Sequence, residues 1–150
     1  MRILLQLVQN ASVSVEGEQI AKIEKGYLLF VGFTAGDDEH VLRKMAEKVF
    51  KLRIFPDENG KTNLSLSQVG GHILSVSQFT LYANMKEGNR PSFTDCMKPE
   101  EAREKFDLFN KILREFEPTL QTGRFQADMK VSLLNEGPFT LILDSRELVK

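Results

Sequence analysis

The sequence has a single cysteine, Cys96, among its 150 residues. One cysteine excludes an internal disulfide framework and a zinc site built from several cysteines, and it is typical of a reduced, intracellular protein. No window approaches the roughly 20 apolar residues that span a bilayer. The first 15 residues, MRILLQLVQNASVSV, hold only a short apolar run followed by alternation, which indicates a strand rather than a signal peptide. We therefore expect a soluble, cytoplasmic protein with no membrane partner.

The sequence also lacks an excess of either charge and several common catalytic motifs. It has 20 Lys and Arg against 21 Asp and Glu, for a formal net charge of -1. That balance argues against a protein that coats nucleic acid by bulk electrostatics, but it is compatible with one that grips a small part of a nucleic acid. No HExxH, GxGxxG or P-loop motif is present, so no metal or organic cofactor is expected.

The chain is the length of one domain, and its apolar periodicity switches between strand and helix. Three- and four-residue spacing predicts helices over 37–52 and 99–117, the second with Pro99 in its first turn and Pro118 after its end. Strands are predicted over 3–15, 20–23, 26–33, 72–83, 129–133 and 139–144, with a long polar loop over 84–98. Residues 1–150 are thus predicted to form one α+β domain.

The two histidines and the cysteine are poor candidates for catalysis. His40 lies in the first turn of a charged helix, where a solvated side chain is the ordinary outcome. His72 is five residues from Ser77, too far along one strand to serve as its base in a triad. Cys96 follows Asp95, whose charge would raise the pKa of the thiol, so an incidental thiol is favoured over a nucleophile.

Two short polar motifs follow apolar strands. The first, Ser77-Gln78-Phe79-Thr80, continues the run from Ile73. On a strand, Gln78 and Thr80 would share one face and Ser77 and Phe79 the other. By spacing alone, an exposed strand end is the favoured interpretation.

The second motif, 135–138, reads Asn-Glu-Gly-Pro and is typical of a turn between two strands. An X-Pro bond can also be cis, which the sequence does not decide.

Taken together, the motifs are more specific. SQFTL at 77–81 and NEGPFT at 135–140 resemble the two motifs of the D-aminoacyl-tRNA deacylase family. ASVSVEGE, LRIFPDENGK, GNRPSF and TGRFQADMKVSLLNEGP resemble the same family in the same order along nearly the whole chain. The resemblance implies curved, barrel-like antiparallel sheets with two main helices, and hydrolysis of the ester bond of D-aminoacyl-tRNAs and of Gly-tRNA mischarged on tRNA(Ala).

The resemblance also implies site residues and partners. The family is a homodimer whose pocket holds the 3′-terminal adenosine of aminoacyl-tRNA. A Gly-cisPro element enters the active site of the partner subunit, where carbonyls and the proline ring reject L side chains. By resemblance, the catalytic residues are Ser77, Gln78, Thr80 and Phe79, whose N–H contributes to an oxyanion hole, and the substrate-binding residues are Gly137, Pro138 and Met129.

Two chemical routes remain open. Thr80 could attack the ester, but no side chain of the motif is a good base at neutral pH. The free ribose hydroxyl beside the ester could instead activate water, with backbone N–H groups stabilising the oxyanion. We favour this substrate-assisted route.

One position departs from the family. Gln6-Leu7-Val8 stands where the family has Gln-Arg-Val, and that arginine helps hold the Gly-Pro element. The substitution leaves open a relaxed-specificity editing deacylase. A non-catalytic module that binds the tRNA 3′ end and a general small-ester hydrolase also remain open as functions. Lys86, Arg90 and Arg124 flank the motifs and are candidates for phosphate contacts.

Overall fold

The computed structural model describes all residues, 1–150, as a mixed α+β fold. One sheet has the strand order β2-β1-β3-β6-β7, with β8 paired to β1, and β4 and β5 form a separate hairpin. The elements are β1 (Arg2–Val15), β2 (Glu18–Ile23), β3 (Gly26–Gly32), α1 (Glu39–Lys51), β4 (Arg53–Pro56), β5 (Thr62–Ser65), β6 (His72–Ser77), the 3-10 helix η1 (Phe79–Tyr82), α2 (Pro99–Phe116), β7 (Gln121–Thr122), β8 (Met129–Asp144) and α3 (Ser145–Leu148).

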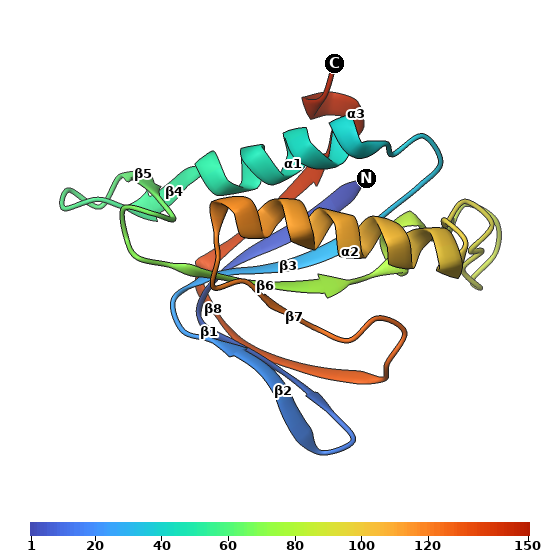
Figure 1. Cartoon of the computed structure of the whole chain (residues 1–150), viewed down its shortest axis with the longest axis horizontal. Coiled ribbons are helices and arrows are strands. Elements are labelled where there is room, and N and C mark those ends of the chain that lie inside the picture. The colour runs from blue at the N-terminus through green and yellow to red at the C-terminus, as the bar shows by residue number, and fades with distance from the viewer.

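The long strand β1 organises the sheet. Its first half pairs with β3 and its second half with β2, while β8 runs antiparallel along its other side for almost the whole length. Alternate residues of β1 are buried from Ile3 to Leu7 and again from Ala11 to Val15, and the exposed Gln9 and Asn10 separate the two stretches. Figure 1 shows β1 and β8 curving away together below the helices. The predicted curved, barrel-like sheet is confirmed, but it is not antiparallel throughout, because β6 runs parallel to both β3 and β7.

The two predicted helices are confirmed and pack side by side over one face of the sheet (Figure 1). The Asp38 side chain accepts a hydrogen bond from the Val41 N–H at 2.9 Å and so caps α1. The buried faces of α1 and α2 form the main core with β1 and β3. A second, smaller core lies between β1, β2, β6 and β8. Strand β6 has buried side chains in both cores, and this fixes its position.

The predicted strand 72–83 is wrong in its second half. Strand β6 ends at Ser77, and the chain turns into η1 instead of continuing the ladder. The turn lies close against Gly32, where a Cβ atom would come within 2.9 Å of the Gln78 carbonyl oxygen. Gln78 and Thr80 therefore do not share a strand face. Phe79, which strand geometry would have placed opposite them, is 53% exposed.

The predicted turn at 135–138 is also wrong, because 129–144 is one strand. Between the pairs Gln6–Thr140 and Val8–Asn135, β1 advances by two positions while β8 advances by five. The additional residues are accommodated as a bulge, and the strand continues in the same direction beside β1. The Gly137–Pro138 peptide bond within this bulge is cis.

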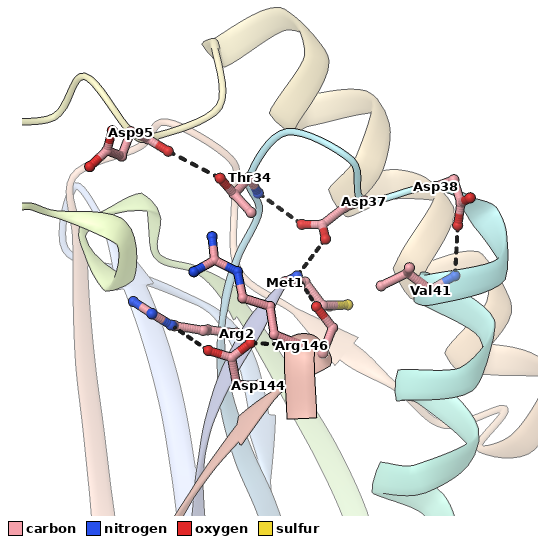
Figure 2. A network of polar contacts seen from close by, with 10 residues as sticks. Met1, Arg2, Thr34, Asp37, Asp38, Val41, Asp95, Asp144 and Arg146 are labelled. Carbon is pink, nitrogen blue, oxygen red and sulfur yellow. Dashed lines mark hydrogen bonds and ion pairs between the residues drawn. The ribbon is translucent and has the colours of Figure 1, made fainter. Parts of the chain in front are cut away.

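A buried polar network joins the start of β1 to the end of the chain (Figure 2). The terminal ammonium of Met1 donates to Asp37 Oδ1 at 2.5 Å and to the Ser145 hydroxyl at 2.6 Å. Beside it, Arg2 Nε donates to Asp144 Oδ2 at 2.9 Å. Burial lowers the pKa of the Met1 ammonium, and the Asp37 carboxylate opposes that effect. No helix in the structure is long and apolar enough to cross a membrane.

Candidate active site

A pocket of about 790 Å³ opens where β6 ends. We name it the Ser77 pocket. Ser77, Gln78 and Phe79 form one wall, and Met129 and Val131 of β8 form another. The loop before α2 and the first turn of that helix close the third side. The pocket thus joins residues of the first polar motif to the start of β8, the strand that also contains the second motif.

Most of the side chains predicted at the site meet in this pocket. Thr80 is exposed and does not line it, but its hydroxyl accepts a hydrogen bond from Gln78 Nε2 at 2.6 Å. Phe79 packs edge-on against Phe93, with ring centroids 5.2 Å apart. Their roles in catalysis stay predictions, because proximity alone does not assign a chemical step.

The backbone at η1 offers donors to a ligand. Leu81 N–H is the first to bond within the turn, to the Gln78 carbonyl at 3.3 Å. The N–H groups of Phe79 and Thr80 therefore have no partner inside η1, as expected at the start of a helical turn. A backbone N–H without a partner at the edge of a pocket is the kind of donor from which oxyanion holes are built.

No side chain in the Ser77 pocket is a ready general base. Lys98 and Asp128 are its only charged lining residues, and both are exposed. His72 lies at the opposite end of β6, where Nδ1 is 2.7 Å from the Thr119 hydroxyl. No cluster of three or more His, Cys, Asp or Glu side chains is arranged to hold a metal ion. Hydrolysis here would therefore depend on the substrate's own groups and on backbone donors.

Cys96 lies in the pocket wall but is not an activated thiol. Burial, together with the Asp95 charge, raises the pKa of Cys96. Its Sγ donates to the Phe79 carbonyl oxygen at 3.4 Å. The thiol thus helps to hold the loop against η1.

Gly137 and Pro138 do not line the Ser77 pocket of their own chain. Both are exposed at the tip of the β8 bulge. Asn135 fixes the base of the bulge: its Nδ2 donates to the Leu7 carbonyl at 2.8 Å and to the Phe139 carbonyl at 3.0 Å. The bulge is therefore an anchored projection.

Leu7, where the sequence departs from the resemblance, has a side chain that is only 4% exposed and belongs to the main core. The leucine side chain has no polar atom, so it cannot donate a hydrogen bond to the bulge. The Gln6 side chain donates to the Thr140 hydroxyl at 3.2 Å, and Gln9 donates to Glu136. Side-chain amides of the strand thus supply contacts along both flanks of the bulge.

Sequence reasoning missed the apolar part of the site. Phe93, Met97 and Phe125 line the Ser77 pocket. The first two fall within the predicted polar loop, 84–98. Several apolar side chains within one polar segment were the available signal, because apolar residues that gather on a surface mark a binding site more often than isolated ones do.

The comparisons with known proteins identify the family. The profile of the family described as D-Tyr-tRNA(Tyr) deacylase matches residues 4–144. A D-aminoacyl-tRNA deacylase of Lactobacillus acidophilus is 54% identical over 144 residues, which are 96% of this chain and 99% of that protein. The chain belongs to the D-Tyr-tRNA(Tyr) deacylase family. A D-aminoacyl-tRNA deacylase of Chloroherpeton thalassium is 51% identical over 97% of this chain and 96% of its own length.

Two solved structures share this fold. A c-Myc DNA unwinding element binding protein has a TM-score of 0.91 at 37% identity, covering 96% of this chain and 98% of its own. A probable eukaryotic D-amino acid tRNA deacylase has a TM-score of 0.85 at 17% identity, covering 95% of this chain and 98% of its own, and that likeness concerns the fold. The resemblance of the motif blocks to this deacylase family is confirmed.

Proposed function

We propose that this protein hydrolyses the ester bond of D-aminoacyl-tRNAs and releases free D-amino acid and tRNA. One observation carries the proposal: Ser77, Gln78, Phe79 and Met129, from two distant motif blocks, line a single pocket in a chain of this deacylase family. The volume, about 790 Å³, suits a ligand the size of a nucleoside with an amino acid attached.

The chemical step is substrate-assisted. The free ribose hydroxyl beside the ester takes a proton from water, and the water oxygen attacks the ester carbonyl carbon. The Phe79 N–H donates to the resulting oxyanion. The bond between the acyl carbon and the ester oxygen of the ribose then breaks, and the neighbouring hydroxyl passes its extra proton to that leaving oxygen. This route fits a pocket wall that has no histidine and whose carboxylate, Asp128, is already paired with Lys130 at 3.1 Å.

The site distinguishes D-aminoacyl from L-aminoacyl substrates by steric exclusion. Gly137 and Pro138 of a second copy would enter the Ser77 pocket and block the side of the α-carbon where an L side chain projects. Glycine has no side chain to reject, so Gly-tRNA mischarged on tRNA(Ala) is also a substrate. Such a site discriminates by clash and by unpaired polar groups, so it should tolerate different D side chains.

The second copy is expected to dock along β8. This strand pairs only with β1, so its other edge carries unpaired backbone groups over sixteen residues. Leu134 and Ile142, on either side of the bulge, are 49% and 74% exposed. Apolar side chains on an open edge favour pairing with another copy, and the homodimer would deliver the bulge to the partner's site. An enzyme with this substrate would act in the cytoplasm.

The direct test is hydrolysis of D-Ala-tRNA, Gly-tRNA(Ala) and L-Ala-tRNA under the same conditions. We expect release of D-alanine and glycine and no release of L-alanine. Comparable cleavage of L-Ala-tRNA would replace strict D-selectivity with a relaxed editing deacylase, the alternative left by Leu7. Tight tRNA binding without turnover of any substrate would make the protein a binding module instead.

A further inference from the structure

A second pocket, of about 840 Å³, lies on the other side of η1 from the Ser77 pocket. We name it the Lys86 pocket. Phe79 of η1 faces the first pocket and Tyr82 the second. The segment Thr94–Lys98 is common to both, with Thr94, Cys96, Met97 and Lys98 lining each of them. A ligand that leaves the Ser77 pocket over this segment enters the Lys86 pocket next.

The lining of the Lys86 pocket is cationic. Arg2, Lys86, Lys98 and Arg146 contribute positive charge, against the carboxylates of Asp95 and Glu101. Lys86, Lys98 and Arg146 form no ion pair within the chain, and all three are exposed. The Arg2 and Arg146 side chains extend from the polar network in the same direction, on the side where Asp95 lies (Figure 2). The Ser77 pocket has only Lys98 as a cation.

The loop that carries Lys86 is held in place. The backbone of Asn84 exchanges two hydrogen bonds of 2.8 Å with Ser92, which closes the base of the loop. The Lys86 N–H donates to Asn84 Oδ1 at 3.0 Å. Met85, beside it, is 71% exposed and lines the same pocket. The wall therefore offers a cation on an anchored stretch of backbone next to an apolar side chain, where a phosphate and an adjoining base could both find contacts.

We infer that the Lys86 pocket binds the nucleotide that precedes the terminal adenosine, with Lys86 and Arg146 on its phosphodiester. This inference rests on the proposed function, because that function places the adenosine in the Ser77 pocket. Of the three cations that flank the motifs in the sequence, only Lys86 lines this pocket; Arg90 lines neither pocket, and Arg124 lies at a separate surface hollow.

The test compares two substrates that differ in this nucleotide: D-Tyr-tRNA, and D-tyrosyl-adenosine, which has no phosphodiester. The double variant K86A/R146A should raise KM for D-Tyr-tRNA by roughly tenfold or more, with kcat kept. Its kcat/KM for D-tyrosyl-adenosine should match that of the wild type. Each phosphate contacted on a single strand contributes about 0.7 to the slope of log affinity against log salt. Since both cations act on one phosphodiester, the slope should flatten by about 0.7.

The matched control is K44A/K111A, which removes the same charge from exposed positions that line neither pocket. An equal loss in the control would mean bulk attraction and overturn the inference. So would an equal loss on both substrates, or no loss on D-Tyr-tRNA. If K86A/R146A lost binding to free cytidine monophosphate while its affinity for tRNA was unchanged, the pocket would be a site for a free nucleotide. That result would also overturn the inference.

A separate readout distinguishes failure of the inference from failure of the proposed function. If the wild type hydrolyses neither substrate, the proposed function fails. Fluorescence anisotropy with labelled, uncharged tRNA then still decides the role of the pocket: weaker binding by K86A/R146A than by K44A/K111A supports it, and equal binding overturns it.

Discussion

Asn135 Nδ2 donates to the backbone carbonyl of Leu7 at 2.8 Å, and this contact ties the β8 bulge to the neighbouring strand β1. The same nitrogen donates to the Phe139 carbonyl at 3.0 Å, on the far side of Gly137 and Pro138. One side chain thus closes a loop that carries Gly137 and Pro138 at its tip. A backbone carbonyl of Leu7 can accept this bond whatever the side chain at position 7, so the anchor does not require an arginine there.

Asn135→Ala should loosen the bulge. Two half-buried carbonyls would lose their donor, which costs about 1–3 kcal/mol of folding stability. If the bulge shapes the partner's site, kcat/KM on D-Tyr-tRNA should fall further than stability explains, with rising cleavage of L-Tyr-tRNA. Urea unfolding measures the loss of stability, and deacylation assays with D-Tyr-tRNA and L-Tyr-tRNA measure the change in activity and selectivity. Ser132→Ala, at an exposed position of the same strand, is the control and should change neither.

Thr80→Ala tests the chemical route. Because the proposed mechanism uses the ribose hydroxyl, the variant should keep substantial deacylation of D-Tyr-tRNA. Loss of a true nucleophile costs on the order of 10⁶-fold in a serine hydrolase. Ser77→Trp, which fills the pocket beside the Phe79 N–H, should abolish turnover while circular dichroism confirms folding. An acyl-Thr80 adduct trapped by rapid quench and mass spectrometry would contradict the substrate-assisted route.

The helices and the first strands follow from the sequence because their periodicity is local. The stripe through Leu42, Met45 and Val49 specifies one buried face, and the alternation through Val13 and Val15 specifies another. Nothing in such a pattern needs knowledge of distant residues.

The local structure of the two polar motifs does not follow from the sequence, for the opposite reason. Strand β6 ends where Gly32, on β3, allows a close approach of the Gln78 backbone. The bulge in β8 exists because Asn135 and Thr140 pair with positions of β1 that are only two residues apart. Both features depend on a partner more than 40 residues away, so local propensity cannot report them. The motif residues were found through family resemblance, which carries that tertiary information implicitly.

A mixing experiment tests whether the bulge acts across subunits. Ser77→Trp has a blocked pocket and an intact bulge, and Pro138→Ala has the reverse. In a heterodimer of the two, one intact pocket would meet one intact bulge, so random mixing should restore about a quarter of the wild-type activity. No gain over the separate variants, with heterodimers verified by native mass spectrometry, would place the bulge in its own subunit's site or nowhere near catalysis.

Ile142→Lys tests the dimer edge. The side chain is 74% exposed, so the substitution should leave monomer folding intact. A charge placed on the open edge of β8 should weaken association of two copies. Multi-angle light scattering should then show a lower mass at micromolar concentration, together with lost activity. Lys22→Ala, on β2, is an exposed control outside β8. An unchanged mass would mean that the dimer interface lies elsewhere on the protein.

The pH dependence of stability should reveal the Arg2–Asp144 pair. Burial raises the pKa of the Asp144 carboxyl, but hydrogen bonds from Arg2 and from the Arg146 N–H outweigh it and hold the pKa below 3.8. The unfolded chain therefore binds this proton more readily, so the stabilisation is complete above pH 3.8 and is lost as the pH falls through the lowered pKa. Asp144→Asn should be less stable than the wild type near neutral pH, and the difference should narrow below pH 3.8. Urea unfolding between pH 3 and 7, with Glu24→Gln as the exposed control, measures it; a gap that stays constant into acid would contradict this assignment.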